Sequence, residues 1–196
     1  SEMCIRDRPC FDPSSAQEAY EMIQEAFEYS EKYGTPVFLR PTTRVCHGYA
    51  SIMVKDETEY THHQPEGFIK DSKRWVIFPR LSFMNHKKIE ARNQELSDIF
   101  SSYEKNTIHP SCDAFKDSKK GIATGGISYT YTMETLKKTG MVKTLKIATP
   151  HPFPEKLAVD FLSGLDEVLC LEELDPVIER ELIYICLLYT SPSPRD

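Results

Sequence analysis

The sequence has no closely spaced pair of cysteines. Its six cysteines are scattered, and no two of them form the Cys-x-x-Cys pattern of zinc and iron–sulfur sites. We therefore expect no metal centre within this chain. Scattered cysteines of this kind are also typical of proteins from a reducing cytoplasm, which is the location that we expect.

The sequence also lacks an excess of basic residues and a long apolar run. It has 24 lysines and arginines against 30 aspartates and glutamates, which gives a formal net charge of −6. Nucleic-acid-binding domains usually carry a basic face, so this balance argues against a nucleic-acid partner. No apolar stretch approaches the roughly 20 residues that cross a bilayer, and we expect no membrane association.

The two ends of the chain are related at the level of DNA. SEMCIRDR (residues 1–8) and CLLYTSPSPRD (residues 186–196) can be back-translated into strings that are reverse complements over their shared stretch. Both strings match a transposon-based sequencing-library adapter, which two unrelated natural termini would not share by chance. We therefore expect both ends to be read-through scars and leave them out of the fold prediction.

The first part of the remaining chain predicts a helix followed by a short strand. Ser15 and Glu18 form a capping-box pattern near the start of residues 12–34, and Gly34 suits a left-handed helix end. The side that we expect this helix to bury consists of Ala19, Ile23, Ala26, Phe27 and Ser30. TPVFLR (residues 35–40) then predicts a buried strand of an α/β sheet, which Pro41 ends because proline cannot donate to a central ladder.

Residues 55–118 are charged and irregular compared with the parts on either side. Within them, residues 87–106 predict a helix whose apolar side consists of Ile89, Leu96, Ile99, Phe100 and Tyr103. We interpret this stretch as a connector with one docking helix. Its histidines, His62, His63 and His86, are expected to be solvent-exposed, because metal sites need more converging ligands.

The last third of the chain alternates strands and helices. Strands are predicted at KGIAT, VKTLKIAT and DEVLCLEE, and a helical stretch follows each of them. This alternation implies a three-layer domain with a parallel sheet and right-handed crossovers. Gly125 and Gly126 lie between the first strand and its helix, where a phosphate cradle or a tight turn would fit. The tight turn is favoured, because the pattern has neither GxGxxG spacing nor a P-loop lysine.

Polar residues gather at the end of the first predicted strand, in LRPTTRVCHG (residues 39–48). The carboxyl ends of parallel strands face the ligand crevice, and arginine suits an anionic ligand. Arg40, Thr43 and Arg44 are therefore candidate cofactor-binding residues, and a hydrogen-bonding role between two units is an equal alternative. Cys46 and His47 are adjacent, so in an extended segment their side chains would point to opposite faces and could not form a nucleophile–base pair.

Carboxylates gather in the same way at the end of the last predicted strand, in CLEELDP (residues 170–176). Glu172, Glu173 and Asp175 could serve acid–base chemistry if burial or a charged neighbour tuned them. The simpler interpretation of Asp175 is the N-cap of the last helix, with Pro176 in its first turn. From these patterns we assign no catalytic residue.

Two longer blocks of the sequence resemble a known enzyme family. The first, PSSAQEAYEMIQEAFEYSEKYGTPVFLRPTTRVCHG, resembles a segment of the alpha subunit of indolepyruvate:ferredoxin oxidoreductases. The second, GIATGGISYTYTMETL with KIATPHPFPEKLAVDFLSGLDEVLCLEELDP, resembles the domain that follows in the same subunit. The blocks have the family's order and are separated by a connector of suitable length.

The resemblance implies an oxidoreductase that uses thiamine diphosphate with Mg²⁺ to decarboxylate aryl pyruvates. Such enzymes pass electrons through iron–sulfur clusters to ferredoxin and form an aryl-acetyl-CoA, so the implied partners are a beta subunit, ferredoxin, a 2-oxoacid and coenzyme A. Residues 9–54 would be the C-terminal part of the pyrimidine-binding domain. Residues 55–118 would be the connector, and residues 119–185 would form a transketolase-C-terminal-like domain.

The motifs by which this family holds its cofactors are absent from the chain. The glutamate that activates the thiamine pyrimidine lies upstream in the family, while the GDG…N motif and the CxxC-rich cluster domain lie downstream. We therefore expect the chain alone to bind neither thiamine diphosphate nor iron and to be inactive. Two alternatives stay open: another thiamine-dependent enzyme, of the 2-oxoglutarate:ferredoxin oxidoreductase or transketolase-like type, and a non-catalytic interaction module.

Overall fold

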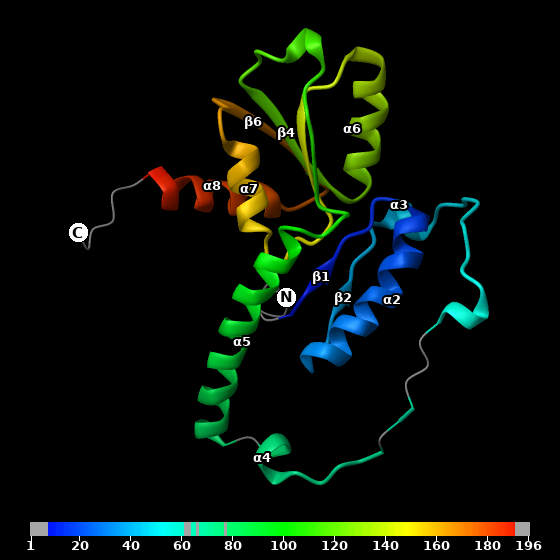
Figure 1. Ribbon diagram of the computed structural model, residues 1–196, viewed down its shortest axis with the longest axis vertical. Helices are drawn as coiled ribbons and strands as arrows, with labels where there is room; N and C mark the ends of the chain where they lie inside the picture. The colour runs from blue at the N-terminus through cyan, green and yellow to red at the C-terminus, as the bar shows by residue number, and fades with distance from the viewer. Residues whose placement is uncertain (1–7, 61–63, 66, 77, 191–196) are drawn as a thin grey trace.

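Two sheets and a long projecting helix make up the molecule (Figure 1). The computed structural model describes residues 8–60, 64–65, 67–76 and 78–190. A two-stranded sheet lies near the N-terminus, and a four-stranded sheet carries the C-terminal third of the chain. The α/β class predicted from the sequence is confirmed.

The small sheet pairs β1 (Cys10–Phe11) with β2 (Phe38–Leu39) in parallel. The connecting helix α2 (Ala16–Tyr33) begins and ends where predicted, because the Ser15 side chain accepts the Glu18 amide and Gly34 has a φ of 56°. The Glu18 carboxylate reaches further back than a capping box requires and accepts the amide and the hydroxyl of Ser14. The strand predicted over residues 35–40 shrinks to β2, since its neighbour β1 is equally short.

The buried side of α2 differs from the predicted one. Met22 and Ala26 are buried, whereas Ile23 and Phe27 remain 41% and 67% exposed. The helix turns this way because the ring of Tyr29 packs against two phenylalanine rings, each at a centroid distance of 5.6 Å. Long-range aromatic packing therefore decides which side of the helix faces the core.

The stretch predicted as a connector contains more secondary structure than expected. It holds the short helix α4 (Ser72–Trp75) and the 3₁₀ turns Glu57–Glu59 and Asp113–Phe115. Another short helix, α3 (Thr43–Cys46), lies just before it. The long helix α5 (Pro79–Phe100) begins eight residues before the predicted start, since proline suits the first turn of a helix. Leu96 and Phe100 of its predicted apolar side are buried, and His86 is exposed as expected. His62 and His63 lie outside the described residues.

The larger sheet has the strand order β3-β5-β4-β6. β4 (Lys120–Gly125), β5 (Lys143–Ile147) and β6 (Glu167–Leu171) are parallel, as predicted. β3 (Thr107–His109), which the sequence did not predict, pairs antiparallel with β5. The sheet is therefore mixed rather than purely parallel, because the segment taken for a connector supplies its edge strand.

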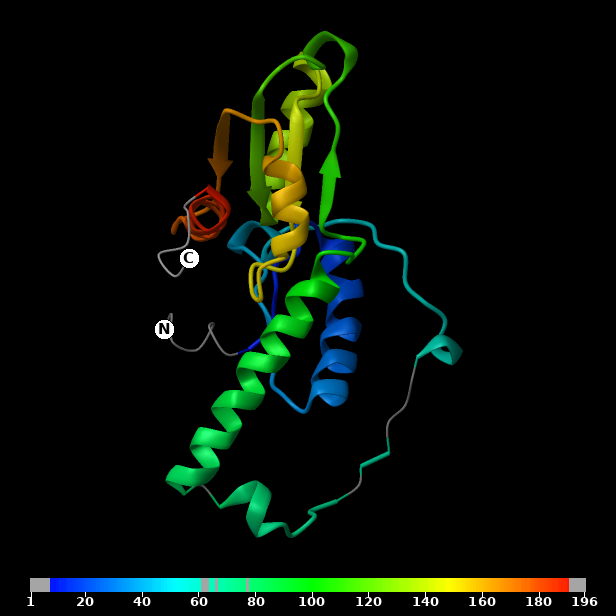
Figure 2. The same cartoon turned by 60° about the vertical axis from the view of Figure 1, so that its left-hand side comes forward.

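Helices cover both faces of the larger sheet (Figures 1 and 2). α6 (Gly126–Thr139) lies on one face, and α7 (Glu155–Leu162) and α8 (Val177–Thr190) lie on the other, which gives the predicted three layers. The core beneath α7 and α8 includes Leu145, Ile147, Phe161, Leu182 and Ile185. α8 continues past residue 185 into the segment expected to be a scar.

Buried ion pairs join α2 to the larger sheet and to the loop before it. Lys146 of β5 pairs with Glu18, and the two side chains are 5% and 18% exposed. Lys105, at 8% exposure, pairs with Glu25 at 2.7 Å and with Glu21 at 3.4 Å. Lysine is almost never buried without a partner, so these pairs fix the acidic side of α2 against the rest of the molecule.

Asn106 makes a second connection, between the end of α5 and the loop that follows β5. Its side-chain amide donates to the Phe100 carbonyl at 2.9 Å and to the Thr149 hydroxyl at 2.6 Å. Its side-chain oxygen accepts the amides of Ala148 and Thr149 at 2.7 and 3.2 Å. All of these groups are buried, so the asparagine satisfies polar atoms that would otherwise be costly.

Two further features concern only the part of the chain that the structure describes. Within it, no helix combines the length and the apolar character needed to cross a membrane. Nor does this part hold a group of three or more His, Cys, Asp or Glu residues that could bind a metal ion.

Candidate functional site

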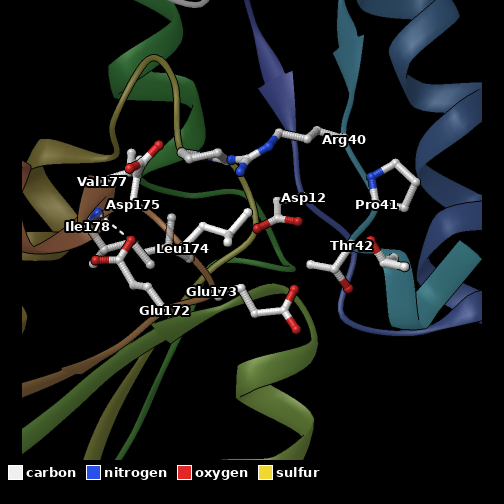
Figure 3. A pocket seen from close by; sticks show the side chains of 14 residues that line it. Asp12, Arg40, Pro41, Thr42, Glu172, Glu173, Leu174, Asp175, Val177 and Ile178 are labelled. Atoms are coloured by element: carbon white, nitrogen blue, oxygen red, sulfur yellow. Dashed lines mark hydrogen bonds between the residues drawn. The ribbon is translucent and has the colours of Figure 1, made fainter. Parts of the chain in front are cut away.

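The carboxyl ends of strands from both sheets meet at one cleft (Figure 3). Open α/β sheets bind ligands at this edge, because the loops that leave the strands surround a crevice there. The cleft has a volume of about 200 Å³. It is lined by Asp12, Arg40, Pro41, Thr42, Thr43, Gly125, Ile147, Pro150, Glu172, Glu173, Leu174, Asp175, Val177 and Ile178.

Main-chain hydrogen bonds hold the walls of the cleft together. The Asp12 amide donates to the Ala148 carbonyl and the Cys10 amide donates to the His151 carbonyl, each at 2.8 Å. These bonds join β1 of the small sheet to the loop after β5 of the larger one. The Arg40 amide donates to the Phe11 carbonyl at 2.8 Å, which places Arg40 beside Asp12. The two sheets thus build the site jointly.

Gly125 and Gly126 make room for Asp12 at the start of α6. Gly126 has a φ of 50°, and a Cβ there would lie 3.0 Å from Oδ2 of Asp12. A Cβ on Gly125 would lie 2.7 Å from the Ile147 carbonyl oxygen, closer than real Cβ contacts. The pair therefore forms a tight turn, as the sequence favoured, whose lack of side chains brings a carboxylate to the helix N-terminus.

The Asp12 carboxyl has an unusual protonation equilibrium. Burial raises the pKa of Asp12 to about 7; Arg40 opposes this rise, and Glu173, Glu18 and Glu172 add to it. A carboxyl group with such a pKa can exchange a proton near neutral pH, as general acids and bases do. Asp12 was not among the residues singled out from the sequence, because the two-residue strand that carries it has no periodicity to reveal it.

The structure separates the three candidate residues at the end of β2. All three residues are exposed, but Arg40 and Thr43 line the cleft, whereas Arg44 on α3 is not part of the lining. Thr42 lies between them, and its hydroxyl oxygen is buried without a hydrogen-bond partner among the described residues. The side chains of Arg40, Thr42 and Asp12 project into the space between the two sheets (Figure 3).

Cys46 and His47 lie outside the cleft lining. The expected extended conformation is wrong, because Thr43–Cys46 form one helical turn with His47 at its C-terminal end. The Cys46 thiol lies 3.8 Å from the Pro41 carbonyl oxygen. His151, the other histidine near the site, bonds to Cys10 through its carbonyl.

Glu172 takes the capping role that the sequence analysis gave to Asp175. Its carboxylate accepts the amides of Ile178 and Glu179 at 2.7 and 3.1 Å, at the start of α8. Leu174 has a left-handed φ of 69°, which reverses the chain and brings Glu172 over the helix N-terminus. Asp175 contributes only its carbonyl, to the amide of Val177. The prediction was wrong because two acidic residues of one loop could both reach the helix.

The cleft does not suit a diphosphate group or its Mg²⁺ ion. Arg40 is the one cationic side chain among the described lining residues, against four carboxylates from Asp12, Glu172, Glu173 and Asp175. A diphosphate needs several donors and would be repelled by these carboxylates. The capping role of Glu172 and the burial of Asp12 leave no open cluster of oxygen ligands for a metal ion.

Comparison with known proteins identifies relatives that align with most of the chain. No family model matches the chain. The indolepyruvate oxidoreductase subunit IorA of Methanothermobacter thermautotrophicus is 36% identical over 179 residues, which cover 90% of this chain and 28% of that subunit. IorA of Pyrococcus abyssi is also 36% identical over 179 residues, 89% of this chain and 27% of the subunit. The chain is related to subunit IorA.

The match confirms the resemblance on which the sequence analysis relied. IorA of Archaeoglobus fulgidus is more distant, with 30% identity over 174 residues, and still aligns with 87% of the chain. The chain spans little more than a quarter of the length of these IorA relatives.

A solved structure that aligns with the chain is more distant in sequence than these relatives. It is a 2-oxoglutarate:ferredoxin oxidoreductase from Magnetococcus marinus, determined with 2-oxoglutarate, coenzyme A and succinyl-CoA bound. The alignment covers 82% of this chain and 29% of that one, at 17% identity and a TM-score of 0.41.

Proposed function

We propose that this chain is a segment of an indolepyruvate:ferredoxin oxidoreductase subunit of the IorA type. The whole enzyme would oxidatively decarboxylate aryl pyruvates such as indolepyruvate to aryl-acetyl-CoA, with ferredoxin as the electron acceptor. The observation that carries this proposal is the 36% identity to IorA over 179 residues, which cover 90% of this chain. The enzyme would be cytoplasmic.

The segment would contribute structure and substrate binding rather than the cofactors. Its cleft does not suit a diphosphate, so thiamine diphosphate with Mg²⁺ would be held by other parts of the enzyme, as would the iron–sulfur clusters. When bound, thiamine diphosphate supplies the electron sink for decarboxylation. A beta subunit, ferredoxin and coenzyme A would be the remaining partners. In this division of roles the described residues position the substrate.

Arg40 is the residue that we propose to bind the substrate carboxylate, with Thr43 beside it. A guanidinium group binds one carboxylate through two parallel hydrogen bonds, so a single arginine is sufficient for a 2-oxoacid. Asp12, whose pKa of about 7 keeps much of it protonated at neutral pH, then repels such an anion less than an ordinary aspartate would. With Asp12 protonated, Arg40 would hold one carboxylate against the charges of Glu172, Glu173 and Asp175.

The proposed activity can be tested on the complete subunit expressed with its beta subunit. We expect indolepyruvate to drive reduction of ferredoxin or of methyl viologen, dependent on coenzyme A and thiamine diphosphate. The isolated 196-residue chain should support no such reduction. A complete complex that reduces the acceptor with 2-oxoglutarate and not with indolepyruvate would contradict the proposed substrate.

The role of Arg40 has a matched comparison in Arg44, which lies four residues further along the chain, is exposed as Arg40 is, and is not part of the cleft lining. Loss of a hydrogen-bonded charge costs about 1.5–3 kcal/mol, so Arg40→Ala should raise KM for the 2-oxoacid roughly 10- to 100-fold. Arg44→Ala should change KM by less than about twofold, as exposed substitutions usually do. Equal effects of the two substitutions, or an effect of Arg40→Ala on kcat alone, would refute the assignment.

A further inference from the structure

Asp12 and Arg40 bring an unpaired carboxyl group and an unpaired guanidinium group into the same cleft. The Arg40 amide donates to the Phe11 carbonyl at 2.8 Å, so the two residues lie on neighbouring strand ends, and their side chains project into one space (Figure 3). Within the described part of the chain, neither side chain forms a hydrogen bond or an ion pair. The two groups therefore act on each other through their charges, and the donors of Arg40 stay open to a ligand.

The protonation of Asp12 depends on the groups that surround it. Burial favours the protonated carboxyl and raises its pKa to about 7, and the positive charge of Arg40 limits this rise. The thiol of Cys10 stays neutral, because burial raises its pKa to about 12. Gly125 and Gly126, which face Asp12 from the end of β4 and the start of α6, carry no charge. The acidic residues nearby are Glu18 on α2 and Glu172, Glu173 and Asp175 in the loop after β6.

A carboxylate bound to Arg40 would act on Asp12 in two ways that have the same direction. It would neutralise the positive charge that favours the ionised form of Asp12, and it would add a negative charge to a cleft that already holds several. An opposite charge favours the ionised form of a carboxyl group and a like charge disfavours it. The bound anion would therefore raise the affinity of Asp12 for a proton.

We infer that Asp12 takes up a proton from solvent when the substrate carboxylate binds to Arg40, and that it thereby acts as a positioning residue that keeps this anion in the cleft. The inference rests on the proposed function, because it takes the substrate to be a 2-oxoacid held by Arg40. The ionised carboxylate of Asp12 accepts the proton, and no other bond forms or breaks. When the substrate carboxylate leaves as carbon dioxide, the charge of Arg40 acts on Asp12 again, and the proton returns to solvent.

Isothermal titration calorimetry of the complete subunit with its beta subunit measures this proton. The ligand is indole-3-propionate, which has the carboxylate and the ring of indolepyruvate but no 2-oxo group to react. Titrations in HEPES and in Tris give different heats when a proton is taken up, because the two buffers ionise with different enthalpies. We expect about half a proton per bound ligand at pH 7, where about half of the free Asp12 is ionised, and about one at pH 8.5. Binding without proton uptake at both pH values would overturn the inference.

Asp12→Asn tests whether the proton goes to this residue. Asparagine resembles protonated aspartate in size and charge, so the variant should bind the ligand without proton uptake. The Kd of wild type should rise roughly tenfold from pH 6 to pH 8, whereas the Kd of the variant should change by less than about twofold. A merely structural role of Asp12 would change Kd by the same factor at every pH. The same rise in Kd for wild type and for a variant with unchanged circular dichroism would overturn the inference.

Two further variants serve as controls. Glu173→Gln removes an exposed carboxylate from the same lining, so it should strengthen binding at every pH and keep the proton uptake. Arg40→Ala should weaken binding and remove the uptake, because the anion then has no cation to bind. Uptake that disappears in Glu173→Gln and persists in Asp12→Asn would overturn the assignment of the proton to Asp12.

The inference and the proposed function fail in different ways. Binding without proton uptake, in a complex that reduces ferredoxin with indolepyruvate, would overturn the inference alone. Proton uptake on binding, in a complex that does not turn over indolepyruvate, would overturn the proposed function and would support the coupling of Asp12 to Arg40. No binding of indole-3-propionate at any pH would overturn the role of Arg40 and the inference together.

Discussion

Replacing Lys146 by methionine tests whether one buried ion pair fixes α2 against the larger sheet. The lysine lies on β5, and its partner Glu18 lies in the first turn of α2. Methionine keeps most of the length and the apolar stem of lysine, so the substitution removes chiefly the charge and its hydrogen bond. The change leaves the carboxylate of Glu18 without its countercharge.

The expected cost follows from the surroundings of Glu18. Breaking a buried pair by removing one partner costs about 3–5 kcal/mol, because the remaining charge is uncompensated. Glu18 keeps hydrogen bonds from the amide and the hydroxyl of Ser14, at 2.8 and 2.7 Å, and its side chain is 18% exposed. We therefore expect the lower end of this range, about 3 kcal/mol.

Urea unfolding at pH 7, followed by circular dichroism, measures this cost. Lys120→Met is the matched control, because Lys120 of the neighbouring strand pairs with Glu167 and both side chains are 69% exposed. Exposed pairs contribute little, so the control should lose less than about 1 kcal/mol. Adding Glu18→Gln to Lys146→Met removes the unpaired charge, keeps an acceptor for Ser14 and should recover about half of the loss.

The pH dependence gives an independent check. Burial works against ionisation of Glu18, but the charge of Lys146 and hydrogen bonds from Lys146 and Ser14 hold the pKa of Glu18 below its usual value of 4.5. A lowered pKa stabilises the fold above the unfolded-state pKa, and this contribution disappears as the pH falls through the folded-state value. The difference between wild type and Lys146→Met should therefore shrink on acidification. The reasoning is refuted if Lys146→Met costs no more than Lys120→Met, or if the double variant is less stable than Lys146→Met.

Two further predictions concern the cleft. Because burial raises the pKa of Asp12 to about 7 from 3.8, its folded form prefers a proton, so the stability of the chain should decline as the pH rises from about 4 to 7. Asp12→Asn should remove this decline, and urea midpoints at pH 5 and pH 8 measure it; parallel profiles for wild type and variant would contradict the assignment. At the start of α8, Glu172→Ala should cost about 1 kcal/mol, as the loss of a cap does, whereas Asp175→Ala should cost less than half of that. Equal losses in urea unfolding would show that both residues cap the helix.

Local signals predicted the parts of the fold that depend on neighbouring residues. Ser15 and Gly34 marked both ends of α2, since caps act within one turn of the helix. The alternation after Lys119 gave β4, β5 and β6 with their helices, because each element is long enough to show its own period. Arg40 and Thr43 line the cleft as expected, because they follow directly on a strand that the local sequence predicted.

The features that the sequence did not predict depend on contacts between distant parts of the chain. β1 and β3 have two and three residues, too few for a period, and they form because a strand far along the chain offers hydrogen bonds. The rotation of α2 depends on Phe11 and Phe100, which lie on other elements. Asp12 became a site residue only because β1 brings it to Gly126, more than a hundred residues away.

The main-chain bonds from Cys10 and Asp12 to the loop after β5 make the cleft a recess of fixed aperture. A hinge between the two sheets would have to break both of these bonds, the pair between Lys146 and Glu18 and the contacts of Asn106 together. A ligand must therefore bind without a hinge motion of one sheet against the other. Such a cleft excludes ligands that are too large for it. Its affinity for a ligand that fits is not reduced by the cost of a hinge motion.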